Sequence, residues 1–275
     1  MSGSMNAFRL LSGEPVSRLG QGAWQIGEDK RKRAAEQDAL RIGLELGLNL
    51  IDTAEMYGNG RSEELIAEVV AGRRDQVYLV SKVLPENASR RGAIVACEHS
   101  LKRLKTDYLD MYLLHWRGSI PLEETLEAFT TLRDRGMIRH YGVSNFDVDD
   151  LTEARALRGG SDAATNQVLY NLEQRGAEWG LLPWSRKHGL ALMAYSPLGS
   201  DSRRVRAHPV LRAMAARIDA TPARIALAWL LRQPDVVVIP KASSEAHVRD
   251  NYAADRKSTR LNSSHVTTSR MPSSA

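Results

Sequence analysis

The chain has little cysteine and no long apolar run. Cys97 is the only cysteine among 275 residues, so no intrachain disulfide can form and a cysteine-based metal site is not indicated. No apolar stretch approaches the ~20 residues of a membrane-spanning helix, and the first residues lack the basic-then-apolar pattern of a secretory signal. We therefore expect a soluble protein of the cytoplasm that binds no metal and has no membrane partner.

Basic residues barely exceed acidic residues once the last part of the chain is set apart. The formal net charge is +5, and residues 255–275 hold four of the basic residues but only one acidic residue. Without this segment, 34 of the 38 basic residues and 32 of the 33 acidic residues remain, which leaves a net charge of +2. Such a charge, without basic clusters between aromatic residues, predicts no nucleic-acid partner.

The last 21 residues differ in composition from the rest of the chain. They are rich in Ser, Thr and Arg, and they show no apolar periodicity after a helical pattern over residues 244–252. A DNA resembling a high-throughput sequencing adapter would encode most of them in frame. We therefore expect a folded domain over residues 1–254 and a non-native, disordered tail over residues 255–275.

Strand-like and helical patterns alternate along the domain. Short β segments at 8–10 and 16–18 flank a Ser-Gly-Glu-Pro turn, which predicts an N-terminal hairpin. Eight strands separated by helices are then predicted, over residues 19–24, 48–51, 77–80, 109–114, 138–143, 163–167, 190–194 and 236–239. This alternation predicts one α/β domain with the (β/α)8 TIM barrel fold. Residues 200–206 are expected to be a mobile, exposed insertion.

Four polar residues lie where three consecutive predicted strands end: Asp52, Tyr57, Lys82 and His115. A free tyrosine has a pKa of about 10 and donates a proton poorly near neutrality unless a positive charge stabilises its phenolate. Lys82 could supply that charge with Asp52 as its counter-ion, and His115 could donate a hydrogen bond to a substrate oxygen.

Each of these residues also has an ordinary interpretation. Tyr57 could be a loop tyrosine, Lys82 a solvated strand end, His115 a core histidine and Asp52 a turn cap. Their convergence on one rim favours catalysis, but spacing alone does not separate carbonyl reduction from a Schiff-base lyase that uses Lys82.

A series of motifs resembles the signatures of the aldo-keto reductase family. They occur in the family's order between residues 10 and 251: Asp52-Thr53-Ala54-Glu55-Met56-Tyr57, Val80-Ser81-Lys82, Leu113-Leu114-His115-Trp116, Tyr141-Gly142-Val143-Ser144-Asn145, Asn166-Gln167 and Ala194-Tyr195-Ser196-Pro197-Leu198-Gly199. Within the family, the chain is most similar to bacterial members of the methylglyoxal-reductase type.

The resemblance implies NADPH-dependent reduction of small aldehydes or ketones, with Tyr57 as the general acid and a monomeric state. The implied cofactor-binding residues are Ser144, Asn145, Gln167, Tyr195, Ser196, Leu198, Gly199, Lys241, Ser243 and Asn251. NADH remains possible, because His247 stands where many members have arginine. It further implies that Trp24 and Trp116 line the substrate pocket, with Met56 beside them, and that a C-terminal helix and loop are missing. A nicotinamide-binding redox-sensor subunit of the same fold is an alternative.

Overall fold

The computed structural model describes residues 8–9 and 15–263, and eight parallel strands form its main sheet. Each strand pairs with the one before it in the chain, as expected when a helix connects consecutive strands. The strands are β3 (Gln21–Gly22), β4 (Leu50–Asp52), β5 (Tyr78–Val83), β6 (Leu109–Leu114), β7 (Ile138–Ser144), β8 (Thr165–Leu169), β9 (Ala191–Tyr195) and β10 (Val236–Val238).

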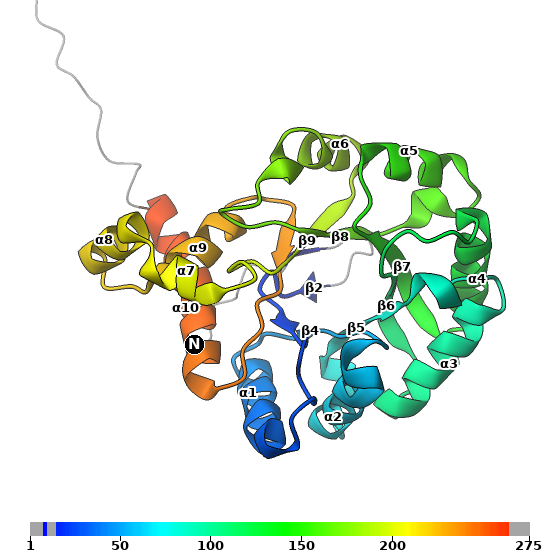
Figure 1. The fold of residues 1–275 in the computed structure, drawn as a ribbon, viewed down its shortest axis with the longest axis horizontal. Coiled ribbons are helices and arrows are strands. Elements are labelled where there is room, and N and C mark those ends of the chain that lie inside the picture. The colour runs from blue at the N-terminus through cyan, green and yellow to red at the C-terminus, as the bar shows by residue number, and fades with distance from the viewer. Residues whose placement is uncertain (1–7, 10–14, 264–275) are drawn as a thin grey trace, which may run out of the picture.

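The sheet curls until its first and last strands meet. Parallel bridges join Leu19 to Val238 and Gly22 to Lys241, and the amide of Gly20 donates to the carbonyl of Val238 at 2.8 Å. The predicted barrel is thereby confirmed, with helices arranged around the strands (Figure 1).

Helices connect the strands on the outside of the barrel. The connecting helices are α1 (Arg33–Glu45), α2 (Arg61–Val70), α3 (Gly92–Leu104), α4 (Leu122–Asp134), α5 (Val148–Ala156), α6 (Leu181–His188) and α9 (Pro222–Leu231). Gly47 and Gly72 follow α1 and α2 with φ of 89° and 74°, a left-handed conformation that glycine adopts without a steric cost.

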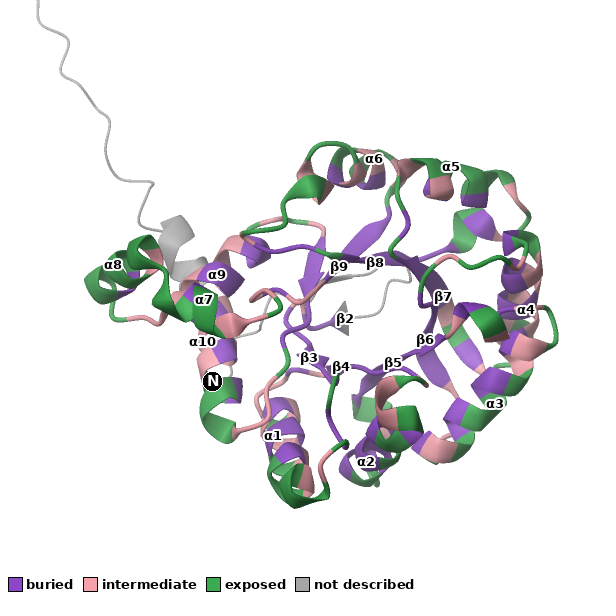
Figure 2. Cartoon of the chain, in the orientation of Figure 1, coloured by how far each residue is buried: buried purple, intermediate pink, exposed green. Residues whose placement is uncertain are grey.

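Two apolar layers hold the barrel together. β4, β5, β6 and β10 are buried at every position, because one face of each strand points into the barrel and the other toward the helices (Figure 2). Val80, Met111, Leu113 and Met193 belong to the inner cluster. Strands buried on both faces need apolar residues at consecutive positions, which explains their apolar runs in the sequence.

The predicted N-terminal hairpin is present. β1 (Phe8–Arg9) pairs antiparallel with β2 (Pro15–Val16), while residues 10–14 lie outside the described part of the chain. Val16 packs with the inner apolar cluster, so the hairpin covers one end of the barrel.

Residues 200–206, predicted to be a mobile, exposed insertion, contribute to a helix. The side chain of Asp201 accepts a hydrogen bond from the amide of Arg203 and caps α7 (Ser202–Ala207), and Val205 is buried beneath it. A further helix, α8 (Pro209–Arg217), begins immediately afterwards with proline in its first turn. The expected exposure holds for Arg203, Arg204 and Arg206.

The predicted boundary at residue 255 does not coincide with a helix end. The helix predicted over 244–252 is α10 (Glu245–Ser263), which continues past that boundary, and the disorder expected for the tail stays a prediction. Once the first turns of α10 are packed against α9, each added residue extends the helix at little cost. Residues 264–275 lie outside the described part, and the non-native origin of the segment stays a prediction. No helix among the described residues is long and apolar enough to cross a membrane.

Candidate active site

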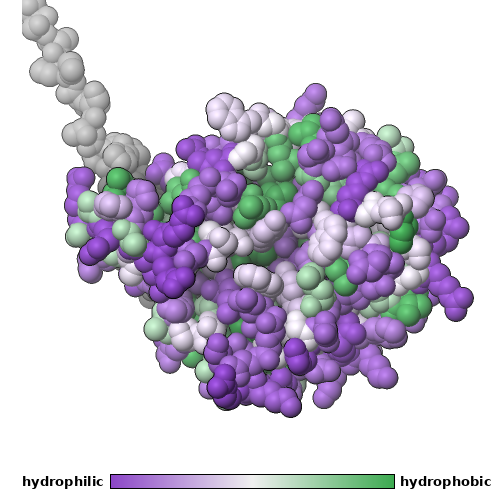
Figure 3. Space-filling model, in the orientation of Figure 1, coloured by the Kyte–Doolittle hydropathy of each residue, from purple (hydrophilic) through white to green (hydrophobic). Residues whose placement is uncertain are grey.

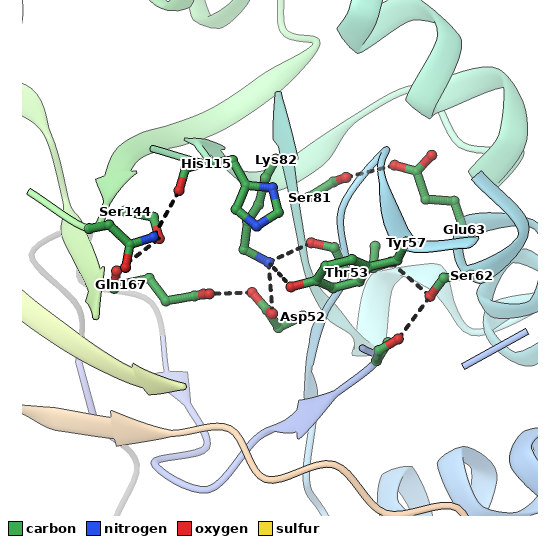
Figure 4. Close-up of polar contacts among 12 residues, drawn as sticks. Asp52, Thr53, Tyr57, Ser62, Glu63, Ser81, Lys82, His115, Ser144 and Gln167 are labelled. Carbon is green, nitrogen blue, oxygen red and sulfur yellow. Dashed lines mark hydrogen bonds and ion pairs between the residues drawn. The ribbon is translucent and has the colours of Figure 1, made fainter. Parts of the chain in front are cut away.

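The four predicted catalytic residues converge at the carboxyl ends of β4, β5 and β6. Asp52 is the last residue of β4, Lys82 lies near the end of β5, and His115 directly follows β6. Tyr57 begins a short 3-10 turn (Tyr57–Gly60) after β4. Parallel strands in register bring these side chains to one rim although they are far apart in sequence (Figure 4).

The ammonium group of Lys82 is fully buried and has three hydrogen-bond acceptors. Nζ lies 2.8 Å from Oδ2 of Asp52, 2.7 Å from the carbonyl oxygen of Thr53 and 3.5 Å from the hydroxyl of Tyr57. Burial acts to lower the pKa of Lys82, but attraction to Asp52 and Tyr57 outweighs it, and the pKa is raised. Lys82 is therefore a fixed positive charge beneath the tyrosine.

The carboxylate of Asp52 connects the ion pair to the residues predicted to bind a nicotinamide. Oδ1 of Asp52 accepts a hydrogen bond from Nε2 of Gln167 at 2.7 Å, across 115 positions of sequence. The hydroxyl of Ser144 donates to the carbonyl oxygen of Gln167 at 2.8 Å, and Nδ2 of Asn145 donates to the Ser144 hydroxyl at 3.2 Å. A continuous polar network thus runs from Lys82 through Asp52 and Gln167 to Ser144 (Figure 4), and the hydrogen bond from Asn145 extends it.

The pKa of the Tyr57 phenol reflects opposing effects of charge and burial. Lys82 acts to lower its pKa as predicted, but burial, the largest effect, and the negative charge of Asp52 raise it, so that the net direction is upward. The predicted effect of Lys82 on the phenol is therefore present, although burial determines the net direction of the pKa. Tyr57 is protonated at neutral pH, which is the form that a proton donor requires.

His115 is a neutral imidazole in this structure. Burial and, secondarily, the charge of Lys82 lower the pKa of His115 to about 3. Its buried Nδ1 has no hydrogen-bond partner among the described residues. A buried N–H without a partner is costly, so we assign the proton to Nε2, which can then donate to a ligand. The expected orienting role, without charge, is consistent with this state.

One cavity of about 690 Å³ joins these residues to the predicted cofactor residues. Every predicted site residue except Lys82 lines it: Trp24, Asp52, Tyr57, His115, Trp116, Ser144, Asn145, Gln167, Tyr195, Ser196, Leu198, Gly199, Lys241, Ser243 and Asn251. Lys82 is fully buried and does not line the cavity itself. Figure 3 shows the barrel from this side, hollowed near its centre between polar and apolar side chains.

The two ends of the cavity have different chemistry. At the catalytic end, Trp24, Met56 and Trp116 are partly exposed and offer apolar surface. At the other end, Lys241 and Ser243 are accompanied by His247 and Arg206. Arg206 was not predicted from the sequence as a residue of this cavity, because the Ser, Asp and Arg content of its segment indicated only an exposed insertion.

Comparison with known proteins places the chain in a family. The model of the aldo/keto reductase family matches residues 18–268, and the chain belongs to this family. It is 49% identical over 238 residues to methylglyoxal reductase YeaE of Escherichia coli, in an alignment that covers 86% of this chain and 84% of that protein. Crystal structures of an aldo/keto reductase from Klebsiella pneumoniae, in complexes with NADP and acetate and with NADPH, superpose with a TM-score of 0.89 at 43% identity. These superpositions cover 98% of both chains.

Proposed function

We propose that this protein reduces small aldehydes and ketones to alcohols with NADPH, and that methylglyoxal represents its substrate class. The observation that carries the proposal is the position of the Tyr57 hydroxyl, held at the cavity wall 3.5 Å from the buried Lys82 ammonium. Similarity to a methylglyoxal reductase and to NADP-bound reductase structures supports the substrate and the cofactor.

The four residues Asp52, Tyr57, Lys82 and His115 account for the protonation step of the reaction. A bound nicotinamide supplies hydride to the carbonyl carbon, and the new alkoxide then needs a proton. Tyr57 donates that proton, and Lys82 stabilises the phenolate that remains. Nε2–H of His115 donates to the carbonyl oxygen and turns it toward the phenol. Asp52 keeps Lys82 charged and in place.

The remaining cavity residues fit a dinucleotide. The side chains of Ser144, Asn145 and Gln167 supply amide and hydroxyl groups for a carboxamide, and the half-buried ring of Tyr195 supplies a stacking surface. The Tyr195 hydroxyl donates to Oδ1 of Asn145 at 2.9 Å, which joins the two groups. The loop that carries Ser196, Leu198 and Gly199 would follow the pyrophosphate, and Lys241, Ser243 and Asn251 would hold the adenosine end.

The partly exposed surfaces of Trp24, Met56 and Trp116 favour a small carbonyl compound. We also retain the cytoplasmic location and the monomeric state as predictions.

Two other functions were compatible with the sequence. A Schiff-base lyase would need an accessible, uncharged amine, whereas Lys82 has 0% exposure, a raised pKa and three acceptors. A redox-sensor subunit would keep the same cavity, so turnover separates it from a reductase.

The experiment is NADPH oxidation by the full chain with methylglyoxal and a panel of small aldehydes, ketones and sugars. Tyr57→Phe should lower kcat by about 100-fold or more while NADPH still quenches protein fluorescence. Tyr108→Phe is the matched control, because Tyr108 lies just before β6, at the opposite end of the barrel, between Arg74 and Arg139. An active Tyr57→Phe variant would remove Tyr57 from the acid role.

A further inference from the structure

The helix α7 carries three arginines, and two of them form ion pairs with carboxylates. Arg203 pairs with Asp201 at 2.9 Å, and Arg204 pairs with Glu173 at 3.3 Å. Arg206 lines the cavity and has no carboxylate partner among the described residues. Its guanidinium therefore keeps its full charge at the end of the cavity.

The contact of Arg206 with His247 defines the state of that histidine. Nη2 of Arg206 lies 3.3 Å from Nε2 of His247. Arginine has only donors, so Nε2 of His247 must accept and carries no proton in this contact. His247 thus orients a neighbouring charge instead of supplying one.

The surrounding residues leave this end of the cavity strongly positive. Lys241, like Arg206, lines it without a carboxylate partner in the described part of the chain. Asp52 is the only carboxylate among the lining residues described, and it is paired with Lys82 at the opposite end. Two uncompensated cations that line one cavity with the Ser243 hydroxyl suit a doubly charged phosphate monoester, and the contact with His247 places Arg206 beside the segment that follows Ser243.

We infer that Arg206, held by His247, is the residue that selects NADPH over NADH. The inference rests on the proposed function and deepens it, since the 2′-phosphate is the group by which the two cofactors differ. Arg206 reaches the phosphate from α7, outside the segment around Lys241 and Ser243. Many family members have an arginine at the position of His247. In this chain Arg206 supplies a guanidinium to the same end of the cavity from α7.

Binding can be tested without turnover by comparing adenosine 2′,5′-bisphosphate with AMP in calorimetry of the full chain. Arg206→Met should weaken binding of the bisphosphate about ten-fold and binding of AMP less than about two-fold, because one charge-assisted contact is lost. Raising the salt concentration should weaken bisphosphate binding more in the wild type than in this variant. Arg203→Met, on the same helix but paired with Asp201, is the matched control and should bind like the wild type.

Two further variants separate positioning from folding. Arg206→Lys should recover part of the affinity, because it restores charge but not the planar fork. His247→Ala should weaken bisphosphate binding in the wild type but have little further effect in the Arg206→Met background.

The Michaelis constants should follow the binding data, with KM for NADPH raised and KM for NADH nearly unchanged in Arg206→Met. Unchanged bisphosphate binding, or an equal loss for both nucleotides, would overturn the inference. If instead Arg206-dependent bisphosphate binding is found but no carbonyl is reduced, the proposed function fails and this inference stands.

Discussion

The substitution Lys82→Met tests the buried ion pair, because it removes the charge but retains a long apolar side chain. Among the described residues, Gln167 would then be the only side-chain donor left to the buried Asp52 carboxylate, and the Thr53 carbonyl would lose its contact with Nζ. Breaking a buried ion pair from one side costs about 3–5 kcal/mol. For a chain of this size each kcal/mol lowers Tm by roughly 2–4 °C, so we expect a decrease of about 6–20 °C.

A double variant separates the cost of the unpaired charge from the loss of catalysis. Asp52→Asn combined with Lys82→Met removes both charges and should recover most of the lost Tm, because no isolated carboxylate remains. It should nevertheless stay inactive, since no ammonium stabilises the Tyr57 phenolate. Thermal unfolding by circular dichroism and NADPH oxidation below the Tm of every variant measure the two effects.

Arg103→Met is the control for stability alone. Arg103 pairs with Glu63, which is fully buried and accepts a hydrogen bond from Ser81, but neither Arg103 nor Glu63 lines the cavity. This variant should lose a similar amount of Tm and keep its kcat. A Lys82→Met protein with wild-type Tm and kcat would refute the reasoning, and so would a double variant as unstable as the single one.

Two further predictions concern residues around the ion pair. The pKa of His115 is about 3 in the folded protein and about 6.5 in the unfolded chain. Below pH 6.5 the unfolded chain therefore binds a proton that the folded protein does not bind, and the free energy of unfolding decreases as the pH is lowered. Between pH 6.5 and 5 this loss is about 1.6 kcal/mol, and urea titrations should show it in the wild type but not in His115→Gln; equal slopes would contradict a neutral His115. Gln167→Leu removes a donor to Asp52 and should cost about 1–3 kcal/mol of stability as well as raise KM for NADPH. A variant with altered KM but unaltered unfolding would show that the Asp52 contact contributes nothing.

The catalytic tetrad could be predicted from the sequence because two regularities combine. Apolar runs of strand length mark where parallel strands end, and a closed barrel brings those ends to one rim. Asp52, Lys82 and His115 each lie at or near such an end. The alternation of strands and helices in the sequence therefore predicted that these three side chains lie close together. Tyr57 required the family resemblance as well, since it lies in a turn beyond β4.

The helices of residues 202–217 could not be predicted from apolar periodicity. Only Val205 and Ala215 are buried in α7 and α8, so neither helix has a wide apolar face to mark it. The capping residue Asp201 was the available signal, and it was weighed as part of an exposed loop. The same segment carries Arg206, which is why that residue was missed.

The sequence by itself determined the barrel and its strand ends, because these depend on local periodicity, and the family motifs in it indicated Tyr57 as the candidate acid. Only the tertiary structure decided the balance of charges and contacts within the site. The contact between Gln167 and Asp52, the upward pKa of Tyr57 and the approach of Arg206 to His247 all depend on distances and burial between segments far apart in the chain. Electrostatic energies change steeply with such distances and with exclusion of water, and neither quantity is encoded in local pattern.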